Sequence, residues 1–568
     1  MATLATSATS ATTVAAPQTS ERPAIVPRTG GELIVDALVK AGVRHAFGIA
    51  GVHNLPVYDA LAQRGQIESY VTRHEQGAAF MADGYARVAG TPGVALVTTG
   101  PGLTNAVTPL AGAWSDSVPL LVIGTAGELP LLGKYKGYLH EYKDQHGVME
   151  AAAGARLVDR TEDLERATLE ALVRMQTGRS RPMTLEVPID VLAASAEVAP
   201  AEIPPIPPPV APDRDAVRRA AQMLREARYP LLFAGGGVAR AGGSDLLLTL
   251  AETLRAPVLS SISGKGAIPD SSLWAAGCTW RTSSGPTDGY PDAWRKADAG
   301  LVVGSRLTGM STRAWRLPLP ERLAHLDVDA SEMSKSYPVE ERLVGDARLG
   351  LELLLAEVER LGGTGASRWN PQEIRDARDA DGDAGEQKCP EAIQIVRGLR
   401  QALPDDGILA CDQAIACYWA VRHFHVQRPR RFLYPAGSAS LGFGLPVGIG
   451  AQVAAPGTPV CVLAGDGGFL FTGTELATAV QYDLPLAIVI CNDNAYGMIK
   501  AAQERRYDGR VIDTELRNPD FVAYGRAFGA YAERLAGPED LAGALAAAWA
   551  RQGPSLFVLD IKLAPPFH

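Results

Sequence analysis

The stretch LAGDGGFLFTGTELATAVQYDLPLAIVICNDNAYGM, residues 463–498, joins two apolar runs through a glycine-rich turn and ends in an acidic turn. The run that ends at Gly465 and the run at 485–491 have the length and the Val, Ile and Leu content of buried strands. Residues 468–482, between them, have the pattern of a helix. Strand, helix and strand in this order predict two neighbouring parallel strands joined by a right-handed crossover.

Two acidic residues follow these strands, Asp466 and Asp493, which lie 27 positions apart. A crossover brings the carboxyl ends of the two strands close together. Mg²⁺ prefers oxygen ligands and often shares them with phosphates, and glycine leaves room for a phosphate beside the backbone. The pattern therefore predicts a magnesium–diphosphate site. The alternative is that both acids only cap turns or helices, which is common for Asp-Gly and Asn-Asp.

The same alternation of apolar runs and helical patterns continues along all 568 residues. Two stretches have the composition of linkers, the proline-dense 197–213 and the glycine-rich, charged 362–387. They separate a predicted N-terminal domain, 27–196, from a central domain, 214–361, and a C-terminal domain, 388–568. Continuous apolar runs spaced by helices predict an α/β fold of three consecutive domains with parallel sheets.

The composition narrows the class of protein. The net charge is -9, with no basic block, which argues against a nucleic-acid partner and against an anionic membrane surface. No apolar run reaches the ~18 residues of a transmembrane helix. The six cysteines form no CxxC pair, so we expect a reduced, cytoplasmic protein. Residues 1–26, rich in Ala, Thr and Ser, are expected to be a disordered tail, with a transit peptide as the alternative.

Three further glycine-rich stretches lie elsewhere in the chain. GFGLPVGIGAQVA, residues 442–454, fits either a ligand contact or tight helix packing. TTGPGLTNAVTPL, residues 98–110, fits a ligand contact or a plain turn. FAGGGVARAGG, residues 233–243, is similar to a dinucleotide-binding loop, but Arg240 stands in place of the last glycine. We therefore predict a turn there.

Together, the GDG…NDN stretch and the order of the domains resemble the acetohydroxyacid synthase-like superfamily of thiamine diphosphate-dependent enzymes. The resemblance covers residues from about 29 to 563. It implies that the first domain binds the pyrimidine ring of the cofactor, that the middle domain is Rossmann-like, and that the last domain binds the diphosphate with Mg²⁺. The implied metal ligands are Asp466, Asp493 and the backbone carbonyl of Ala495. Many relatives carry Asn in place of Asp493, and both side chains offer an oxygen.

The resemblance also implies the residues that contact the cofactor. Leu441 matches the bulky apolar residue that wedges beneath the cofactor, and Met498 matches a residue that faces the substrate pocket. The loop at 412–416 lacks the Gly-Gln-His of typical acetohydroxyacid synthases. The remaining implied contacts are Asp412, Gln413, Ala414, Gly465, Asp466, Gly467, Gly468, Ala495, Tyr496 and Gly497.

VTRHEQGAAF, residues 71–80, resembles the glutamate segment of the same family. The match implies that Glu75 hydrogen-bonds a nitrogen of the aminopyrimidine ring and so promotes proton loss from the thiazolium carbon. A weakly solvated carboxyl can share a proton in this way. The alternative is an acid that only stabilises a helix N-terminus. Because the family's cofactor spans a subunit interface, the resemblance implies a homodimer or a homotetramer.

The N-terminal domain is most similar to benzaldehyde lyase, in TGGELIVDALVKAGVRHAFGIAGVHN and in NAVTPLAGAW. His53 stands in place of an active-site histidine of that enzyme. His140 lies near the position of its active-site glutamine, with Gln145 as a rival. Both histidines are candidate proton shuttles, because imidazole exchanges protons near neutral pH. The alternative for each is a surface or structural histidine.

The expected activity is that of a thiamine diphosphate-dependent carboligase or lyase with a 2-keto acid as donor. The C-terminal domain is similar to acetohydroxyacid synthase. The central domain departs from that family, because GSRLTGMSTRAW, residues 304–315, stands in place of the RFDDR motif that contacts flavin and the second keto acid. This departure makes bound FAD doubtful. A benzaldehyde lyase-type acyloin lyase and a 2-keto acid decarboxylase are the alternatives. Glu75, Asp466 and Asp493 argue against a non-catalytic relative, and the altered glycine loop argues against a dinucleotide oxidoreductase.

Overall fold

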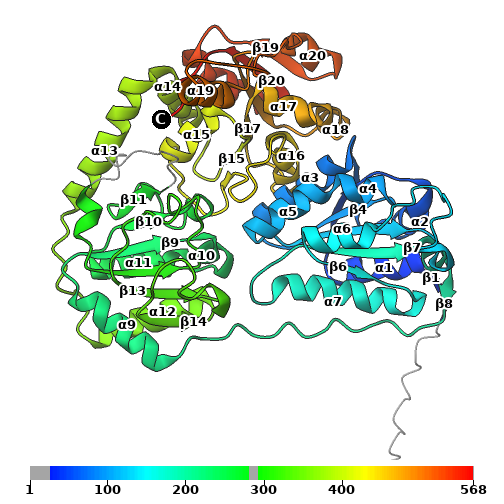
Figure 1. Cartoon of the computed structure of the whole chain (residues 1–568), viewed down its shortest axis with the longest axis horizontal. Helices are drawn as coiled ribbons and strands as arrows, with labels where there is room; N and C mark the ends of the chain where they lie inside the picture. The colour runs from blue at the N-terminus through cyan, green and yellow to red at the C-terminus, as the bar shows by residue number, and fades with distance from the viewer. Residues whose placement is uncertain (1–25, 280–291, 567–568) are drawn as a thin grey trace, which may run out of the picture.

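The computed structural model describes residues 26–279 and 292–566. The predicted disordered tail, except for its last residue, lies outside the described residues. In the described part of the chain, three successive segments each form a six-stranded sheet, and every pair of strands within these sheets is parallel. Helices cover the sheets (Figure 1). The predicted α/β class with three parallel sheets is therefore confirmed.

The first sheet has the strand order β3-β2-β4-β5-β7-β6. The residues of its central strands β4 and β5 are all buried and almost all apolar, as expected for a sheet covered on both faces. The elements of this segment are β1 (Arg28–Thr29), α1 (Gly30–Lys40), β2 (His45–Gly48), η1 (Val52–Asn54), α2 (Leu55–Arg64), β3 (Glu68–Val71), α3 (Glu75–Ala89), β4 (Gly93–Val97), α4 (Pro101–Asn105), α5 (Val107–Asp116), β5 (Leu120–Ala126), η2 (Leu129–Leu131), α6 (Gln145–Ala152), β6 (Ala155–Leu157), η3 (Thr161–Asp163), α7 (Leu164–Gln176), β7 (Met183–Pro188), α8 (Ile189–Ala193) and β8 (Ser195–Ala196).

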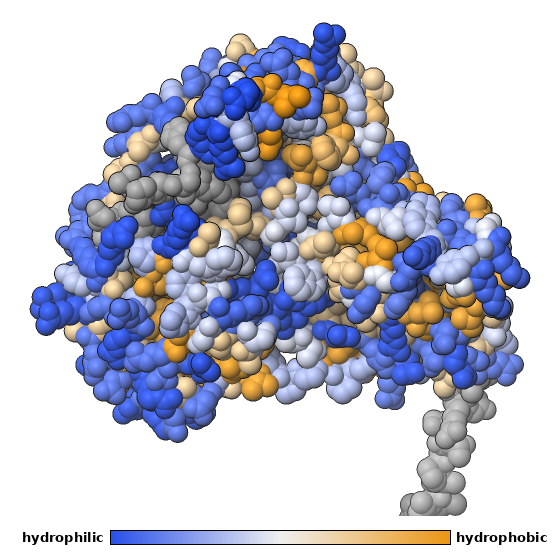
Figure 2. Space-filling model, viewed as in Figure 1, coloured by the Kyte–Doolittle hydropathy of each residue, from blue (hydrophilic) through white to orange (hydrophobic). Residues whose placement is uncertain are grey.

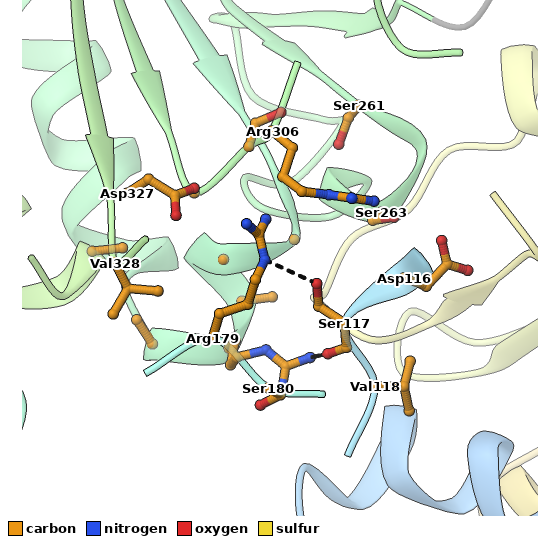
Figure 3. A pocket seen from close by; sticks show the side chains of 18 of the residues that line it. Asp116, Ser117, Val118, Arg179, Ser180, Ser261, Ser263, Arg306, Asp327 and Val328 are labelled. Atoms are coloured by element: carbon orange, nitrogen blue, oxygen red, sulfur yellow. Dashed lines mark hydrogen bonds between the residues drawn. The ribbon is translucent and has the colours of Figure 1, made fainter. Parts of the chain in front are cut away.

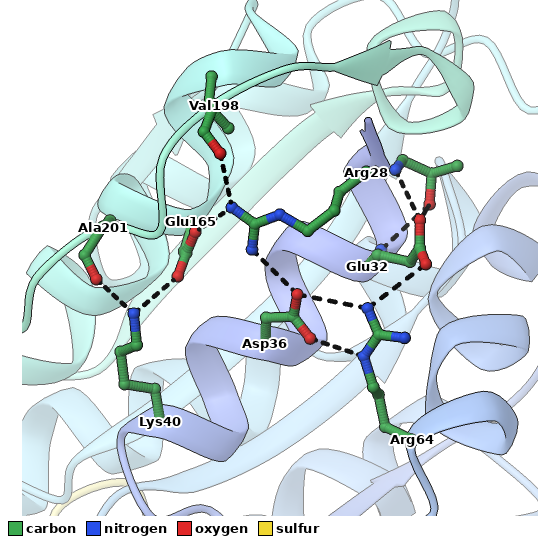
Figure 4. Close-up of polar contacts among 9 residues, drawn as sticks. Arg28, Glu32, Asp36, Lys40, Arg64, Glu165, Val198 and Ala201 are labelled. Carbon is green, nitrogen blue, oxygen red and sulfur yellow. Dashed lines mark hydrogen bonds and ion pairs between the residues drawn. The ribbon is translucent and has the colours of Figure 1, made fainter. Parts of the chain in front are cut away.

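A charged network fastens the start of the described chain to this first segment (Figure 4). Arg28, on β1, donates to Asp36 at 3.0 Å and to the buried Glu165 at 2.9 Å. Lys40 reaches the other oxygen of Glu165 at 3.1 Å, and Arg64 binds Asp36 at 2.8 Å. Strand β1 pairs antiparallel with β8, so both ends of the segment are held together.

The central sheet has the order β11-β10-β9-β12-β13-β14, so the strand order reverses at β9. Where the sequence predicts a turn after β9, a short helix, α10, begins at Gly236. The elements are α9 (Arg214–Glu226), β9 (Pro230–Ala234), α10 (Gly236–Ala241), α11 (Ser244–Leu254), β10 (Val258–Ser260), η4 (Ile262–Gly264), β11 (Ala275–Cys278), η5 (Asp292–Lys296), β12 (Ala299–Val303), β13 (Arg322–Asp327), η6 (Ala330–Glu332), β14 (Glu341–Val344) and α12 (Ala347–Arg360).

The third sheet has the order β16-β15-β17-β18-β20-β19. Strands β17 and β18 are parallel neighbours with Gly465 opposite Cys491, so their carboxyl ends lie together as predicted. The elements are α14 (Pro390–Ala402), β15 (Ile408–Cys411), α15 (Ile415–His423), β16 (Phe432–Leu433), α16 (Gly444–Ala454), β17 (Val460–Gly465), α17 (Asp466–Thr472), η7 (Gly473–Glu475), α18 (Leu476–Gln481), β18 (Ala487–Asn492), α19 (Gly497–Arg506), α20 (Phe521–Ala527), β19 (Tyr531–Arg534), η8 (Pro538–Asp540), α21 (Leu541–Ala548) and β20 (Ser555–Asp560).

The two predicted linkers differ in structure. Residues 199–213 contain no helix or strand and run from the first segment to the central one, along the lower edge in Figure 1. Most of 362–387, in contrast, forms the helix α13 (Pro371–Lys388). Its N-cap, Asn370, accepts a hydrogen bond from the Gln372 N–H, and proline occupies the first turn, where its missing N–H is not needed.

The first and third segments share one core through helices α3 and α16. A Cβ added at Gly84 would lie 2.3 Å from the Val447 carbonyl oxygen, and one added at Gly450 would lie 1.9 Å from the Met81 carbonyl oxygen. The two helix backbones therefore approach to within a distance that only glycine permits. The glycine-rich stretch at 442–454 thus serves tight helix packing.

Several large apolar side chains are exposed, and Figure 2 shows orange patches over both the first and the third segments. The exposed set includes Val52, Leu55, Leu132, Tyr135, Leu139, Leu470, Phe471, Ile499, Tyr507 and Ile512. Among the helices of the described chain, none combines the length and the apolar character needed to cross a bilayer.

Candidate active site

Glu75 is the first residue of α3 and lies directly beyond strand β3, where its side chain is half-buried. Its Oε2 atom accepts a hydrogen bond from the Asn105 amide at 2.9 Å. Its Oε1 atom lies beside Gly102, where an added Cβ would be 3.6 Å away. Helix α4, which follows β4, therefore fixes the orientation of the carboxyl at the carboxyl ends of the strands, where ligands bind in open parallel sheets.

His53 and His140 are brought together at the same edge of the sheet, with ring centroids 5.3 Å apart. His53 is buried, and its Nδ1 atom is 2.8 Å from Thr99 Oγ1, which in turn is 2.7 Å from Thr125 Oγ1. The ring of Tyr138 stacks on His53 at 6.1 Å. Burial lowers the pKa of His53, and the neighbouring His140 lowers it further. Both effects favour the neutral form of His53.

Gln145 is fully engaged by the chain. Its Oε1 atom accepts from the Gly100 N–H at 2.6 Å, while its Nε2 donates to the Thr125 carbonyl at 3.1 Å and to Glu186 at 2.6 Å. Gly100 has a φ of 63°, and a Cβ there would lie 2.4 Å from the His140 carbonyl oxygen. Gln145 thus fixes the glycine turn on which His140 rests.

Asp466 and Asp493 lie at the adjacent ends of β17 and β18. Asn518 Nδ2 donates to Asp466 Oδ2 at 2.6 Å and to Asn492 Oδ1 at 2.9 Å, which links the two strand ends. Burial raises the pKa of Asp493 to about 6, and the negative charge of Asp466 contributes. Burial also raises the pKa of Asp466. Two carboxylates that destabilise each other's charge are a suitable binding site for a divalent cation.

The turn after Asp493 is held by a distant segment. Asp493 Oδ1 accepts from the Ala495 N–H at 3.2 Å, and Asn494 has a φ of 55°. On either side of Ala495, Tyr496 N–H donates to the Thr514 carbonyl at 2.8 Å and Leu516 N–H donates to the Asn494 carbonyl at 2.7 Å. The expected carbonyl ligand therefore sits in a fixed turn.

The glycines of this region are required by close neighbours. A Cβ at Gly467 would lie 2.7 Å from the Tyr496 ring, and one at Gly468 would lie 2.8 Å from Asp412 Oδ1. At Gly497 it would lie 2.6 Å from Asp493 Oδ2, and at Gly465 3.0 Å from Ala414. The predicted contact residues thus form one cradle around the strand ends.

Asp412, a predicted cofactor contact, has its carboxylate engaged by the chain itself. Its carboxylate is buried and accepts from the N–H groups of Gln413 at 2.7 Å, Gly442 at 3.1 Å and Gly444 at 2.8 Å. Burial raises its pKa to about 6, and these three N–H groups counteract the rise. Leu441 directly precedes one of these donors, and its Cδ2 would lie 3.4 Å from a Cβ at Gly468. Asp412 therefore fixes the wedge residue against the cradle.

Gln413 offers a donor to a ligand. Its Oε1 accepts from the Tyr434 hydroxyl at 3.0 Å. Its Nε2 is buried and has no hydrogen-bond partner among the residues that the structure describes. A buried donor without a partner costs free energy, so this site suits an acceptor such as a phosphate oxygen.

These residues fit thiamine diphosphate with Mg²⁺. No group of three or more His, Cys, Asp or Glu side chains within the described ranges could hold a metal by itself. Two carboxylates, a backbone carbonyl and diphosphate oxygens would complete an all-oxygen site of the kind that Mg²⁺ prefers. The glycine cradle and the Gln413 donor suit the diphosphate itself.

A separate cavity of about 1480 Å³ opens at the carboxyl ends of the central strands and is closed by residues of the first segment (Figure 3). Its lining is cationic. Arg179 Nε donates to Ser117 Oγ at 3.2 Å, Arg240 bonds Ser180 Oγ at 2.6 Å, and Arg306 bonds the Ser115 carbonyl. Burial lowers the pKa of Arg240 to about 10. The loop that replaces the expected flavin motif contributes Arg306 to this cavity.

Comparison with known proteins shows a thiamine diphosphate-dependent enzyme, a transferase or a lyase. The chain matches the descriptions "Thiamine pyrophosphate enzyme, N-terminal TPP binding domain" over 28–148, "central domain" over 217–354 and "C-terminal TPP binding domain" over 414–559. The chain belongs to the thiamine pyrophosphate enzymes and is a member of their acetolactate synthase-like group.

Three curated relatives span nearly the whole chain. The probable 2-ketoarginine decarboxylase AruI of Pseudomonas aeruginosa is 37% identical over 547 residues, 94% of each chain. The probable acetolactate synthase large subunit of Methanocaldococcus jannaschii is 31% identical and covers 94% of this chain and 92% of its own. The acetolactate synthase isozyme 3 large subunit of Escherichia coli is 31% identical, over 90% of this chain and 91% of its own.

The sequence reasoning missed the partners of the predicted residues. Asn105 lies within the glycine-rich stretch 98–110, and this position could have indicated that it contacts the site. Asn518 carries no such signal, because it lies 52 positions after Asp466 in an ordinary polar segment.

Proposed function

We propose that this chain decarboxylates a 2-keto acid with thiamine diphosphate and Mg²⁺ and transfers the acyl unit to a second carbonyl compound. The observation that carries the proposal is the pairing, in one chain, of a half-buried Glu75 oriented by Asn105 with Asp466 and Asp493 at adjacent strand ends. The acetolactate synthases among the relatives support a carboligase.

Each predicted residue then has a task. When bound, thiamine diphosphate supplies a nucleophilic carbon that adds to a carbonyl and accepts the electron pair left by departing CO₂. Asp466, Asp493 and the Ala495 carbonyl hold Mg²⁺, and Gln413 donates to the diphosphate through Nε2. Leu441, fixed through Asp412, supports the cofactor from below.

The proton chemistry belongs to the first segment. Glu75 shares a proton with the pyrimidine ring through Oε1, while Asn105 holds Oε2. His53, whose Nδ1 is engaged with Thr99, exchanges protons with the substrate through Nε2, and His140 assists. Met498, partly buried at the start of α19, limits the size of the acceptor.

Release of the product as an aldehyde, without an acceptor, is the second candidate. The relative with 37% identity is a probable 2-ketoarginine decarboxylase, and its name supports a 2-keto acid with a cationic side chain as the substrate. A benzaldehyde lyase-type cleavage of acyloins, based on the resemblance around His53, is the third candidate.

We further propose a homodimer or a homotetramer in which the cofactor lies between subunits. Exposed apolar residues adjoin both halves of the site, Leu470 and Phe471 after Asp466, and Leu139 beside His140. A second copy would bury these residues. Five of the six cysteines are buried, which supports a reduced compartment such as the cytoplasm.

The test is incubation of the purified chain with thiamine diphosphate, Mg²⁺ and a panel of pyruvate, 2-ketoarginine, other 2-keto acids and acyloins, with product identification. A hydroxyketone or a 2-hydroxy-2-methyl keto acid would support the carboligase. Aldehyde as the sole product from every keto acid would overturn it in favour of the decarboxylase. Activity of colourless protein without added FAD would confirm that flavin is not required.

A further inference from the structure

Glu475 is a fully buried carboxylate at the contact between the first and third segments. Its Oε1 accepts from the Arg73 N–H at 3.1 Å and from the His74 N–H at 3.0 Å. Its Oε2 accepts from the Arg73 N–H at 3.2 Å and from Thr478 Oγ1 at 2.8 Å. A side chain of the third segment thus holds the two backbone N–H groups that immediately precede Glu75.

Within the described ranges, no ion pair accounts for the burial of this carboxylate. The Arg73 guanidinium donates instead to the Val71 carbonyl at 3.2 Å and to Gln481 Oε1 at 2.8 Å. Glu475 is therefore held by neutral donors and by the positive end of helix α3, which favours a negative charge. Burial raises the pKa of Glu475, and its hydrogen bonds together with the charge of Arg73 counteract the rise. Burying a carboxylate is unfavourable unless such contacts offset the loss of water.

Gly77 provides a second, independent observation. A Cβ at this position would lie 2.1 Å from Glu475 Oε1. The first turn of α3 therefore lacks a side chain at the point where the carboxylate approaches. The start of α3 therefore has room for the Glu475 carboxylate only because residue 77 is glycine.

We propose that Glu475 is a positioning residue for Glu75: it fixes the backbone at 73–74 so that the Glu75 side chain points to Asn105 and the cofactor site. This inference rests on the role of Glu75 proposed above. Glu475 lies nine positions after Asp466, on the segment that begins with the metal ligand. One short segment therefore connects the metal end of the enzyme with its proton-relay residue.

The same contact surface offers a matched control. Tyr482 accepts from the Val71 N–H at 2.8 Å and donates to the Ser69 carbonyl at 3.0 Å. Tyr482→Phe removes two hydrogen bonds between the same segments, but these bonds end on strand β3 and do not reach the start of α3. The phenyl ring keeps the ring contact with Tyr70.

The direct measurement is amide hydrogen–deuterium exchange of the full chain without cofactor. In Glu475→Gln we expect exchange in a peptide covering 72–76 to be at least about tenfold faster, because one acceptor oxygen is lost. In Tyr482→Phe we expect faster exchange at 69–71 and an unchanged rate at 72–76. Unchanged exchange at 72–76 in Glu475→Gln would overturn the proposal.

Turnover is the second measurement. We expect kcat to fall about tenfold or more in Glu475→Gln and in Gly77→Ala, with the KM for Mg²⁺ within about twofold of wild type. Tyr482→Phe should retain kcat within about twofold. If kcat in Glu475→Gln stays at the wild-type value while exchange at 72–76 is faster, Glu475 only stabilises the fold and the proposal is wrong.

A folding failure would not prevent the test. Should Glu475→Gln fail to fold, Glu475→Asp keeps the charge and withdraws the carboxylate by one methylene. Thr478→Val removes the hydroxyl that donates to Glu475 and to the Val71 carbonyl, but leaves the Arg73 and His74 N–H bonds in place. The proposal requires that Glu475→Asp speed amide exchange at 72–76, and that it lower kcat more than Thr478→Val does. Full activity of Glu75→Gln, in contrast, would refute the proposed function whatever the exchange data show.

Discussion

Glu75 acts, in our proposal, through one oxygen while the other is held by Asn105. Glu75→Gln keeps the shape and the hydrogen bond but cannot carry the proton. We expect kcat to fall by about 10²- to 10⁴-fold, the usual contribution of a general acid–base group. The rise in melting temperature on adding thiamine diphosphate and Mg²⁺ should persist, because the metal end is unchanged.

Asp466→Asn is the contrasting variant, since it should lose that rise in melting temperature together with activity. Turnover of Glu75→Gln within twofold of wild type on every substrate would contradict the assigned role.

His53 gives a prediction about pH. Burial and the neighbouring His140 hold its pKa below the usual 6.5, so His53 stays neutral at a pH where an unfolded chain already takes up the proton. The acidic limb of the kcat profile should therefore lie below pH 6.5. In His140→Gln the repelling charge is gone, the pKa of His53 rises, and the limb should move to higher pH. A limb that stays in place would show that His53 is not the titrating group.

Among single residues, those in short motifs could be predicted from the sequence. Those whose hydrogen-bond partners are distant in the sequence could not. Asp466, Asp493 and Glu75 each follow a strand and have a glycine or an alanine within two positions, so the local pattern reveals them. Asn518 and Glu475 become visible only in three dimensions, because their partners lie 52 and about 400 positions away. Asp412 stands in a recognisable loop, but its carboxylate binds backbone N–H groups of the chain itself.

The crossing of α3 and α16 sets the distance between the first and third sheets. Gly450→Ala would place a Cβ 1.9 Å from the Met81 carbonyl oxygen, and we expect a loss of ~1–3 kcal/mol in the free energy of unfolding, as for an overpacked core. Denaturant unfolding measures it.

Gly382→Ala, in the polar helix α13, is the matched control. Nothing lies within 4 Å of its added Cβ, so helix propensity alone should raise stability by up to ~1 kcal/mol. Equal effects of the two substitutions would show that the close helix approach does not limit stability.

The strands were predictable because continuous runs of Val, Ile and Leu are typical of strands buried on both faces, and β17 and β18 pair as the crossover rule requires. Helices were less predictable. The helix predicted over 468–482 is divided into α17, η7 and α18, and the break at η7 is where Glu475 turns toward α3. The glycines of residues 362–387 favour a linker, yet the Asn370 cap and the i,i+4 hydrogen bond from Gln372 to Asp376 support α13.

For the whole molecule, the proposed shared site makes a prediction about mixed oligomers. Chains carrying Glu75→Gln and chains carrying Asp466→Asn are each expected to be inactive. If the cofactor lies between subunits, a mixed dimer has one site with both defects and one intact site. Co-expressed, randomly assorted chains should recover about a quarter of wild-type activity, because half of the dimers are mixed. No recovery would mean that each site is built within one chain.

The connection at 199–213 crosses from the first sheet to the central one without a helix or strand of its own, whereas the first and third segments are joined by a shared core. We therefore expect the first segment to remain bound to the rest of the protein when the chain is cut between residues 199 and 213. A gene divided here should yield two polypeptides that reassemble into a working enzyme when produced in the same cell. Such a two-piece form would allow the N-terminal third of one relative to be exchanged for that of another without redesigning a junction.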